Sequence, residues 1–206
     1  VELIARKRKQ STEEAGRTVR REAFETMCRE EGGTRIASAH HSNDNAETIL
    51  LNLARGTGLK GLCGIRPVYG KWIRPLLGVS REEIESALVQ EKIPWRQDLS
   101  NEEDVYTRNR IRHHILPALQ EQVNPETARH LNELSCQAQE IWDYVERGVD
   151  EAWERCIVSP PGKTEAFTVR ELPFRKEMPA VQKQLLHRCI CRAAGRSRDV
   201  EAVHVS

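Results

Sequence analysis

Residues Ala37–Gly58 read Ala-Ser-Ala-His-His-Ser-Asn-Asp-Asn-Ala-Glu-Thr-Ile-Leu-Leu-Asn-Leu-Ala-Arg-Gly-Thr-Gly, and the rest of the chain is organised around them. A short run at residues 35–39 predicts a buried strand. The spacing of the apolar side chains further on predicts a helix that begins near Asn43. This stretch therefore predicts a strand, a polar turn and a helix in direct succession.

Three polar residues at the start of the predicted helix share one face. Asp44, Glu47 and Thr48 are spaced i, i+3 and i+4. They follow His40 and His41, which stand at the carboxyl end of the predicted strand, where open α/β sheets bind their ligands. The helix dipole keeps carboxylates of a first turn ionised, so they suit Mg²⁺ or an amine.

A purely structural interpretation of the same residues stays open at this point. Asp, Asn and Thr near a helix start are common capping residues. Spacing alone does not decide between capping residues and a functional site.

The string from His40 to Thr48, His-His-Ser-Asn-Asp-Asn-Ala-Glu-Thr, resembles the His-His-x-Asp-Asp-Gln-x-Glu-Thr signature of tRNA(Ile)-lysidine synthetases. Asn43 stands where the family usually has Asp, and Asn45 where it usually has Gln. Because Asn43 weakens the acidic pair, the expectation of a metal ligand rests on Asp44 alone.

The resemblance implies a role for each matching residue. Asp44 is expected to hold Mg²⁺ or to position the reacting groups, and Glu47 to recognise the lysine ammonium. His40 is expected to lie beside the nucleotide, and Thr48 to contact substrate.

A predicted helix from a capping box at Ser11 and Glu14 to about Glu31 carries a second match. Its segment Glu-Glu-Ala-Gly-Arg-Thr-Val-Arg-Arg resembles the family's Glu-Glu-Ala-x-Arg-x-x-Arg-Tyr. The second arginine, Arg20, is therefore expected to point into the nucleotide site. Arg21 replaces the usual Tyr, which puts that aromatic contact in doubt.

The third informative segment is Thr-Arg-Asn-Arg-Ile-Arg-His-His at residues 107–114. Arg108 and Arg112 are spaced i, i+4, so they project together from a helix and suit bidentate contact with phosphate. A solvated basic helix is the alternative. The segment resembles the family's Arg-Asn-x-Ile-Arg phrase, which implies that both arginines and Asn109 lie near nucleotide and tRNA.

Further elements follow from apolar spacing and from Pro and Gly. We expect a strand at 71–77, which contains the family phrase Arg-Pro-Leu-Leu, a helix from Ser80 to about Glu91, a long helix from Asn124-Pro125 to about Val158, a short strand at 167–169 and a helix at 178–194.

The predicted fold class is α/β. By resemblance, residues 1–123 form the rear half of a Rossmann-like PP-loop nucleotide-binding domain, and residues 124–206 form a helical, tRNA-binding domain that is cut short at its carboxyl end.

Composition restricts the class of protein further. The chain has 206 residues, 38% apolar content and a net charge of +1, so it can bury a core but has no global basic field for nucleic acid. Its six cysteines lack disulfide or zinc spacing. Without a signal peptide or a long apolar run, we expect a cytoplasmic protein with no membrane association.

The resemblance implies a ligase that uses ATP and Mg²⁺ to join lysine to carbon 2 of the wobble cytidine of tRNA(Ile) through an adenylated tRNA. A homodimer stays an option. The family's phosphate loop, Ser-Gly-Gly-x-Asp-Ser, does not occur in these residues, and the chain begins at Val1 in mid-pattern. We therefore expect a fragment that is inactive alone. Another PP-loop tRNA-modifying enzyme, a non-enzymatic RNA-binding fragment and a metal site built on His40 and His41 stay open.

Overall fold

The computed structural model describes residues 12–96, 107–158 and 167–194. Its elements in chain order are α2 (Thr12–Glu30), β1 (Ile36–Ala37), α3 (Ser42–Ala54), α4 (Leu59–Leu62), β2 (Val68–Tyr69), β3 (Trp72–Ile73), α5 (Arg81–Gln90), α6 (Thr107–Arg110), the π-helical segment η2 (Ile111–Ile115), α7 (Leu116–Gln122), α8 (Thr127–Cys156), β4 (Ile157–Val158), β5 (Thr168–Val169), α9 (Glu171–Lys176) and α10 (Pro179–Ala193). The predicted α/β class is confirmed.

The chain divides into two compact units. The first contains residues 1–48 and 65–129, and the second contains residues 49–64 and 130–206. The predicted domain boundary at 123/124 stays a prediction.

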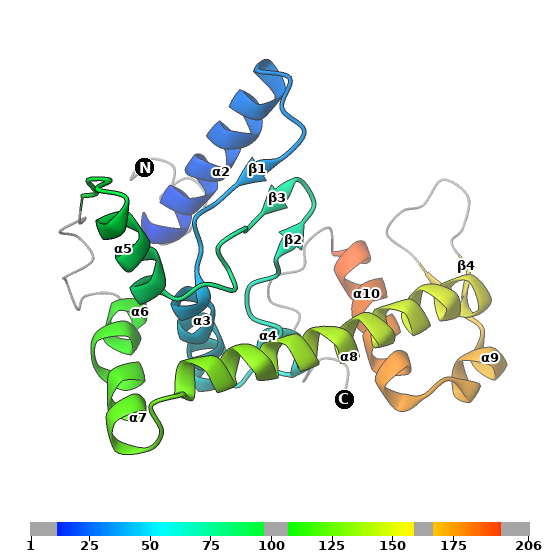
Figure 1. Cartoon of the computed structure of the whole chain (residues 1–206). Coiled ribbons are helices and arrows are strands. Elements are labelled where there is room, and N and C mark those ends of the chain that lie inside the picture. Colours follow the sequence, from blue (N-terminus) through cyan, green and yellow to red (C-terminus); the bar gives the residue numbers. More distant parts are fainter. Residues whose placement is uncertain (1–11, 97–106, 159–166, 195–206) are drawn as a thin grey trace. The chain divides into compact units, whose positions relative to one another are not determined.

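The sheet of the first unit has the strand order β1-β3-β2. β1 pairs with β3 in parallel, with Ile36 opposite Trp72, and β2 pairs with β3 in antiparallel. α2 lies beside this sheet (Figure 1), where the Trp72 indole donates a hydrogen bond to Glu25 (3.2 Å). β1 ends at Ala37, so its carboxyl end lies just before the turn that leads into α3 at Ser42.

The strand predicted at 71–77 is shorter than expected. Only Trp72 and Ile73 pair with β1, and Arg74 donates one further backbone bond to Pro67. Pro75 has no N–H to continue the ladder, and the chain then turns into α5. Ser80 and Glu83 form the predicted capping box at the start of that helix.

The second unit is built around α8, the long helix predicted to end near Val158, which ends at Cys156. Its core consists of Val149, Ala152 and Cys156 from α8 with Leu185 from α10, all fully buried. Figure 1 shows α10 lying against the second half of α8. Gly148 permits this approach, because a Cβ there would lie only 3.2 Å from Val181 Cγ2.

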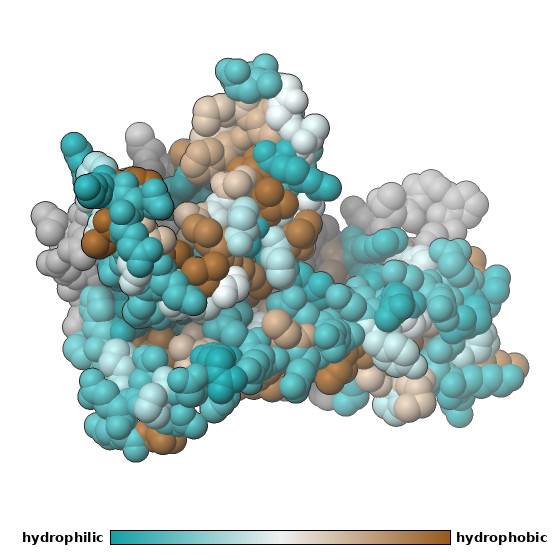
Figure 2. Space-filling model, viewed as in Figure 1, coloured by the Kyte–Doolittle hydropathy of each residue, from teal (hydrophilic) through white to brown (hydrophobic). Residues whose placement is uncertain are grey.

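α4 packs onto the first half of α8 through polar contacts. The Cys63 carbonyl accepts hydrogen bonds from Ser135 Oγ (2.8 Å) and Gln139 Nε2 (2.7 Å). Ile141 and Tyr144 of α8 are exposed instead of forming a core stripe. Figure 2 shows hydrophilic residues over much of the visible side of α8.

The start of α8 differs from the prediction. Pro125 was expected at the first helical position, but the helix begins at Thr127. Asn124 Oδ1 accepts the backbone N–H of Glu126 (2.9 Å) and holds the preceding residues in a turn. The short helix α9 was not predicted.

All six cysteines are free, and Cys28, Cys63, Cys156 and Cys189 are buried as expected for core thiols. None of the helices in the described parts of the chain combines the length and the apolar character needed to cross a membrane.

Candidate functional site: a buried cluster of carboxylates and arginines

The polar face predicted at the start of α3 meets the arginines of α6 and η2. Glu47 lies at the centre of this cluster, with a side chain only 2% exposed. Arg108 Nε donates to Glu47 Oε2 (2.9 Å). Arg112 binds the same carboxylate with a fork, from Nε to Oε1 (2.6 Å) and from Nη2 to Oε2 (3.0 Å). Two guanidinium groups therefore share one buried carboxylate.

Asp44 contributes the second carboxylate. Its Oδ1 accepts a hydrogen bond from Arg112 Nη2 (3.1 Å) and lies 3.7 Å from Arg108 Nη2. Its backbone carbonyl accepts Arg108 Nη2 (3.0 Å). Two carboxylates thus face two guanidinium groups, and the formal charges of these four groups balance.

The other oxygen of Asp44 caps α3. Oδ2 accepts the backbone N–H of His41 (3.1 Å), the residue directly before the helix, as the third residue of a capping box does. Capping and participation in the cluster were alternatives in the sequence, and in the structure Asp44 does both with different oxygens.

Thr48 completes this face of α3. Its Oγ1 donates to the Asp44 carbonyl (2.8 Å) and accepts Arg108 Nη2 (3.3 Å). Asn109 is buried within α6, next to Arg108. The residues predicted on the two segments are therefore brought together, although about 60 positions separate them in the sequence.

A change of helix type separates the two arginines in the chain. α6 is α-helical, and at Ile111 the chain enters the π-helical segment η2. Ile111 is 2% exposed and anchors the segment. Burial opposes the positive charge of Arg112, but the hydrogen bonds and charge of Glu47 outweigh it and raise the pKa of Arg112. The guanidinium is therefore firmly charged.

His40 lies at the end of the extended segment after β1, where Ser38 Oγ is 3.0 Å from its Nδ1. Burial lowers the pKa of His40 below its ordinary value of 6.5; the charge of Asp44 opposes this shift, and nearby arginines, Arg74 first, add to it. His40 is therefore neutral at neutral pH.

His41, which the sequence placed at the end of the predicted strand but not among the predicted site residues, is a neighbour of the cluster. Its Nε2 lies 3.5 Å from Asp44 Oδ2. Its Nδ1 is buried and has no hydrogen-bond partner among the described residues. The sequence feature that indicates this contact is the position of His41 directly before α3, three residues before Asp44.

Arg20, also predicted for the site, lies on the exposed side of α2 and takes no part in the hydrogen bonds of the cluster. Its predicted role stays a prediction, as do those of the residues in the cluster.

The cluster suits charged ligands better than a protein-only metal site. Among the described residues, no group of three His, Cys, Asp or Glu side chains is placed to hold a metal ion. Asp44 supplies one carboxylate, which fits the way Mg²⁺ is commonly held, by one or two carboxylates together with substrate phosphates.

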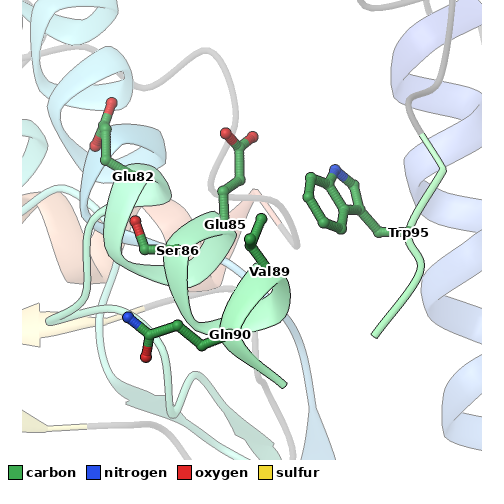
Figure 3. A pocket seen from close by; sticks show the side chains of 6 residues that line it. All are labelled: Glu82, Glu85, Ser86, Val89, Gln90 and Trp95. Atoms are coloured by element: carbon green, nitrogen blue, oxygen red, sulfur yellow. The ribbon is translucent and has the colours of Figure 1, made fainter. Parts of the chain in front are cut away.

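A separate open pocket lies along α5, lined by Glu82, Glu85, Ser86, Val89, Gln90 and Trp95 (Figure 3). None of the predicted site residues lines it. Glu85 already accepts Arg81 Nε (2.7 Å). We assign no function to this pocket.

Comparison with known proteins adds the family context. Residues 1–119 match the PP-loop domain family. The chain is 37% identical over all of its 206 residues to a tRNA(Ile)-lysidine synthase of Caldanaerobacter subterraneus subsp. tengcongensis, of which it covers 43%. It is 39% identical, over 82% of its length, to the enzyme of that name from Chlorobaculum tepidum, of which it covers 53%.

A third relative is the tRNA(Ile)-lysidine synthase of Porphyromonas gingivalis, which is 48% identical over 122 residues, or 59% of the chain and 27% of that protein. The chain therefore spans about half the length, or less, of these curated relatives.

Proposed function

Because this chain belongs to the PP-loop domain family, we propose that it is part of a tRNA(Ile)-lysidine synthase, a ligase that joins lysine to the wobble cytidine of tRNA(Ile) at the expense of ATP. Residues 1–123 are then the rear half of a Rossmann-like nucleotide-binding domain. Residues 124–206 begin a helical domain that contacts tRNA.

One observation carries the proposal. The two segments that resemble the lysidine synthetase signatures fold onto each other and form one cluster of Asp44, Glu47, Arg108 and Arg112. In a decayed or unrelated sequence, there would be no reason for two motifs far apart in the chain to fold together and pair two carboxylates with two guanidinium groups. The cluster offers carboxylates for an amine and guanidinium groups for phosphate, which are the charged groups that this reaction brings together.

The reaction has two steps. In the first, the carbon-2 oxygen of the cytidine attacks the α-phosphorus of ATP, and pyrophosphate leaves. In the second, the lysine ε-nitrogen, after losing a proton, attacks carbon 2, and AMP leaves with the oxygen. The first step demands neutralisation of phosphate charge, and the second demands placement of an amine.

We assign the arginines to the neutralisation of phosphate charge in the first step, and the carboxylates to the placement of the amine in the second step. Arg108 and Arg112 engage phosphate oxygens, and Arg20 is assigned to phosphate as well, on the resemblance of its segment alone. Because both arginines also bind Glu47, phosphate and Glu47 compete for the same guanidinium donors. A phosphate that draws an arginine away leaves Glu47 able to receive the lysine ammonium.

The neighbouring residues support this division. His40 is kept neutral, so it adds no positive charge to repel the ammonium. Thr48 orients Arg108, and Asn109 helps to fix its helix. Asp44 would hold Mg²⁺, which would supply further charge neutralisation.

The test is incorporation of labelled lysine into a tRNA(Ile) transcript by the gene product that contains this sequence, with ATP and Mg²⁺. We expect ATP-dependent incorporation in the wild type. Glu47→Gln and Arg112→Lys should each lower the rate on the order of 10²-fold, by analogy with the loss of one charge-stabilising donor. Arg112→Lys keeps the charge but removes the fork.

Matched controls make this test specific. Arg110→Lys changes an exposed arginine of the same segment, which contacts Thr107, and Glu85→Gln changes a carboxylate of α5. Both should leave the rate within about twofold, as surface substitutions usually do. A wild type that incorporates no lysine, or a Glu47→Gln variant with full activity, would refute the proposal.

A further inference from the structure

Two asparagines flank Asp44 on α3, at the positions where this chain departs from the lysidine synthetase signature. Asn43 Oδ1 accepts the backbone N–H of Arg81, the first residue of α5 (3.0 Å). Asn45 Oδ1 accepts the backbone N–H of Ile65 (2.6 Å), and its side chain is buried. Each amide oxygen is thus bound by a backbone donor from another segment.

Helix geometry places these contacts on either side of the charged face. At about 100° per residue, Asn43 and Asn45 lie about 200° apart around the helix axis. The directions of Asp44, Glu47 and Thr48 all fall within the arc between them. The two hydrogen bonds therefore bracket the face that meets Arg108 and Arg112.

The hydrogen bond of Asn43 also satisfies a backbone donor at the start of α5. The first N–H groups of a helix have no partner within the helix. Ser80 Oγ binds the N–H of Glu83, and Asn43 binds the N–H of Arg81 (3.1 and 3.0 Å). A carboxylate would fill the position of Asn43 equally well, because a helix N-terminus favours negative charge.

We propose that Asn43 and Asn45 are positioning residues, which fix the rotation of α3 and so hold Asp44 and Glu47 in register with the two arginines. Residue 43 is then not a metal ligand, and the acidic residue that the signature carries there serves as a hydrogen-bond acceptor. The effect on catalysis rests on the proposed function. The hydrogen-bonding role does not.

The test compares Asn43→Asp, Asn43→Ala and Asn45→Ala in the gene product that contains this sequence. Rates are measured per folded molecule, as a function of Mg²⁺ concentration. Both alanine variants should lower kcat, on the order of 10- to 10²-fold, because small misplacements of reacting groups are costly. Asn43→Asp keeps the acceptor and should restore kcat to within about twofold at an unchanged half-saturating Mg²⁺ concentration.

The matched control is Asn52→Ala on the same helix. Asn52 Nδ2 donates to the Gly61 carbonyl (2.8 Å), one turn beyond Thr48 and outside the hydrogen bonds of the charged cluster. Its loss should lower the unfolding temperature but leave kcat unchanged, which separates a positioning role from general stability.

Two results would overturn the inference. One is a half-saturating Mg²⁺ concentration about tenfold lower in Asn43→Asp, because an added metal ligand would strengthen binding. The other is full kcat in Asn43→Ala. If Asn43→Ala does not fold, the Mg²⁺ dependence of Asn43→Asp decides alone.

An inactive wild type would refute the proposed function and leave the hydrogen-bonding role to be judged by thermal unfolding. Asn43→Ala should then lower Tm by about 2–4 °C while Asn43→Asp keeps it, because the alanine leaves the Arg81 N–H without its acceptor. An unchanged Tm in Asn43→Ala would refute that role too.

Discussion

Each of the two units contains an arginine bound to two carboxylates, and the two arrangements differ in burial. In the first unit, Arg112 binds Glu47 and Asp44, whose side chains are 2% and 14% exposed. In the second, Arg188 of α10 binds Glu146 and Asp150 of α8, whose side chains are 33% and 68% exposed. A second arginine, Arg108, joins only the first arrangement.

The surroundings explain what each arrangement does. Arg188 lies at the rim of an apolar core that already holds α10 against α8. Its carboxylate partners, unlike those of Arg112, are partly or largely exposed to water, so its ion pairs are weak. The cluster on α3 instead contains a nearly inaccessible carboxylate, so its charges carry a desolvation cost that only full pairing offsets. Because burial of these charges costs free energy, the cluster is better explained by a functional site than by a contribution to stability.

Loss of the central carboxylate should give the largest effect. Glu47→Ala leaves two half-buried guanidinium groups without their main acceptor and should lower the free energy of unfolding by about 3–5 kcal/mol. Urea unfolding measures this. Glu146→Ala, the counterpart in the second unit, should cost no more than about 1 kcal/mol. Equal costs would show that the two arrangements are equivalent.

An apolar truncation should show what holds the second unit. Leu185 is fully buried between α8 and α10, so Leu185→Ala should cost about 2–5 kcal/mol through lost transfer energy and a cavity. The same unfolding experiment tests it. Leu186→Ala on the same helix, where the side chain is only partly buried, is the control and should cost less. If Leu185→Ala lowered the free energy of unfolding by less than Arg188→Ala does, the ion pairs and not the apolar core would hold α10 against α8.

Removal of the rim arginine should have a smaller effect. Arg188→Ala should cost about 1 kcal/mol or less, and the cost should shrink in about 1 M NaCl because salt screens exposed charges. Comparison of unfolding curves at low and high salt measures both. A cost that salt leaves unchanged would mean that Arg188 acts through packing.

The smallest effect concerns pH in the first unit. Because burial lowers the pKa of His40 below its ordinary value of 6.5, the folded state binds a proton less readily than the unfolded state. The stability that His40 contributes is therefore complete above pH 6.5 and is lost as the pH falls towards the lowered value. Unfolding between pH 7 and about 5 should show a shallower decline in His40→Gln. Parallel curves would contradict the shift.

Elements with strong local signals were predictable from the sequence. α2, α3, α5, α8 and α10 follow apolar spacing and caps, and their predicted positions hold to within a few residues. The short strands were less predictable, because their length depends on partners elsewhere. β3 ends where Pro75 removes a donor, although the apolar run continues through Leu77.

The candidate site, like the fold, was predictable only where a local pattern in the sequence determines it. The predictions placed Asp44, Glu47 and Thr48 on one helix face and let Arg108 and Arg112 project together, and the structure agrees. The pairing of the two groups could not be read from the sequence, since it requires α3 and α6 to meet. The bonds of Asn43 to Arg81 and of Asn45 to Ile65 likewise join segments that no local pattern connects.

The π-helical segment η2 has a consequence for how relatives are aligned. A π-helical turn takes up more residues than an α-helical turn over the same axial distance. The chain between Arg112 and α7 thus behaves as if one residue had been inserted into a regular helix. Relatives can gain or lose a residue here by switching helix type, and keep both arginines in place. Single-residue gaps at 113–115 are therefore expected among sequences whose sites are equivalent, and gaps between residues 43 and 48 are not.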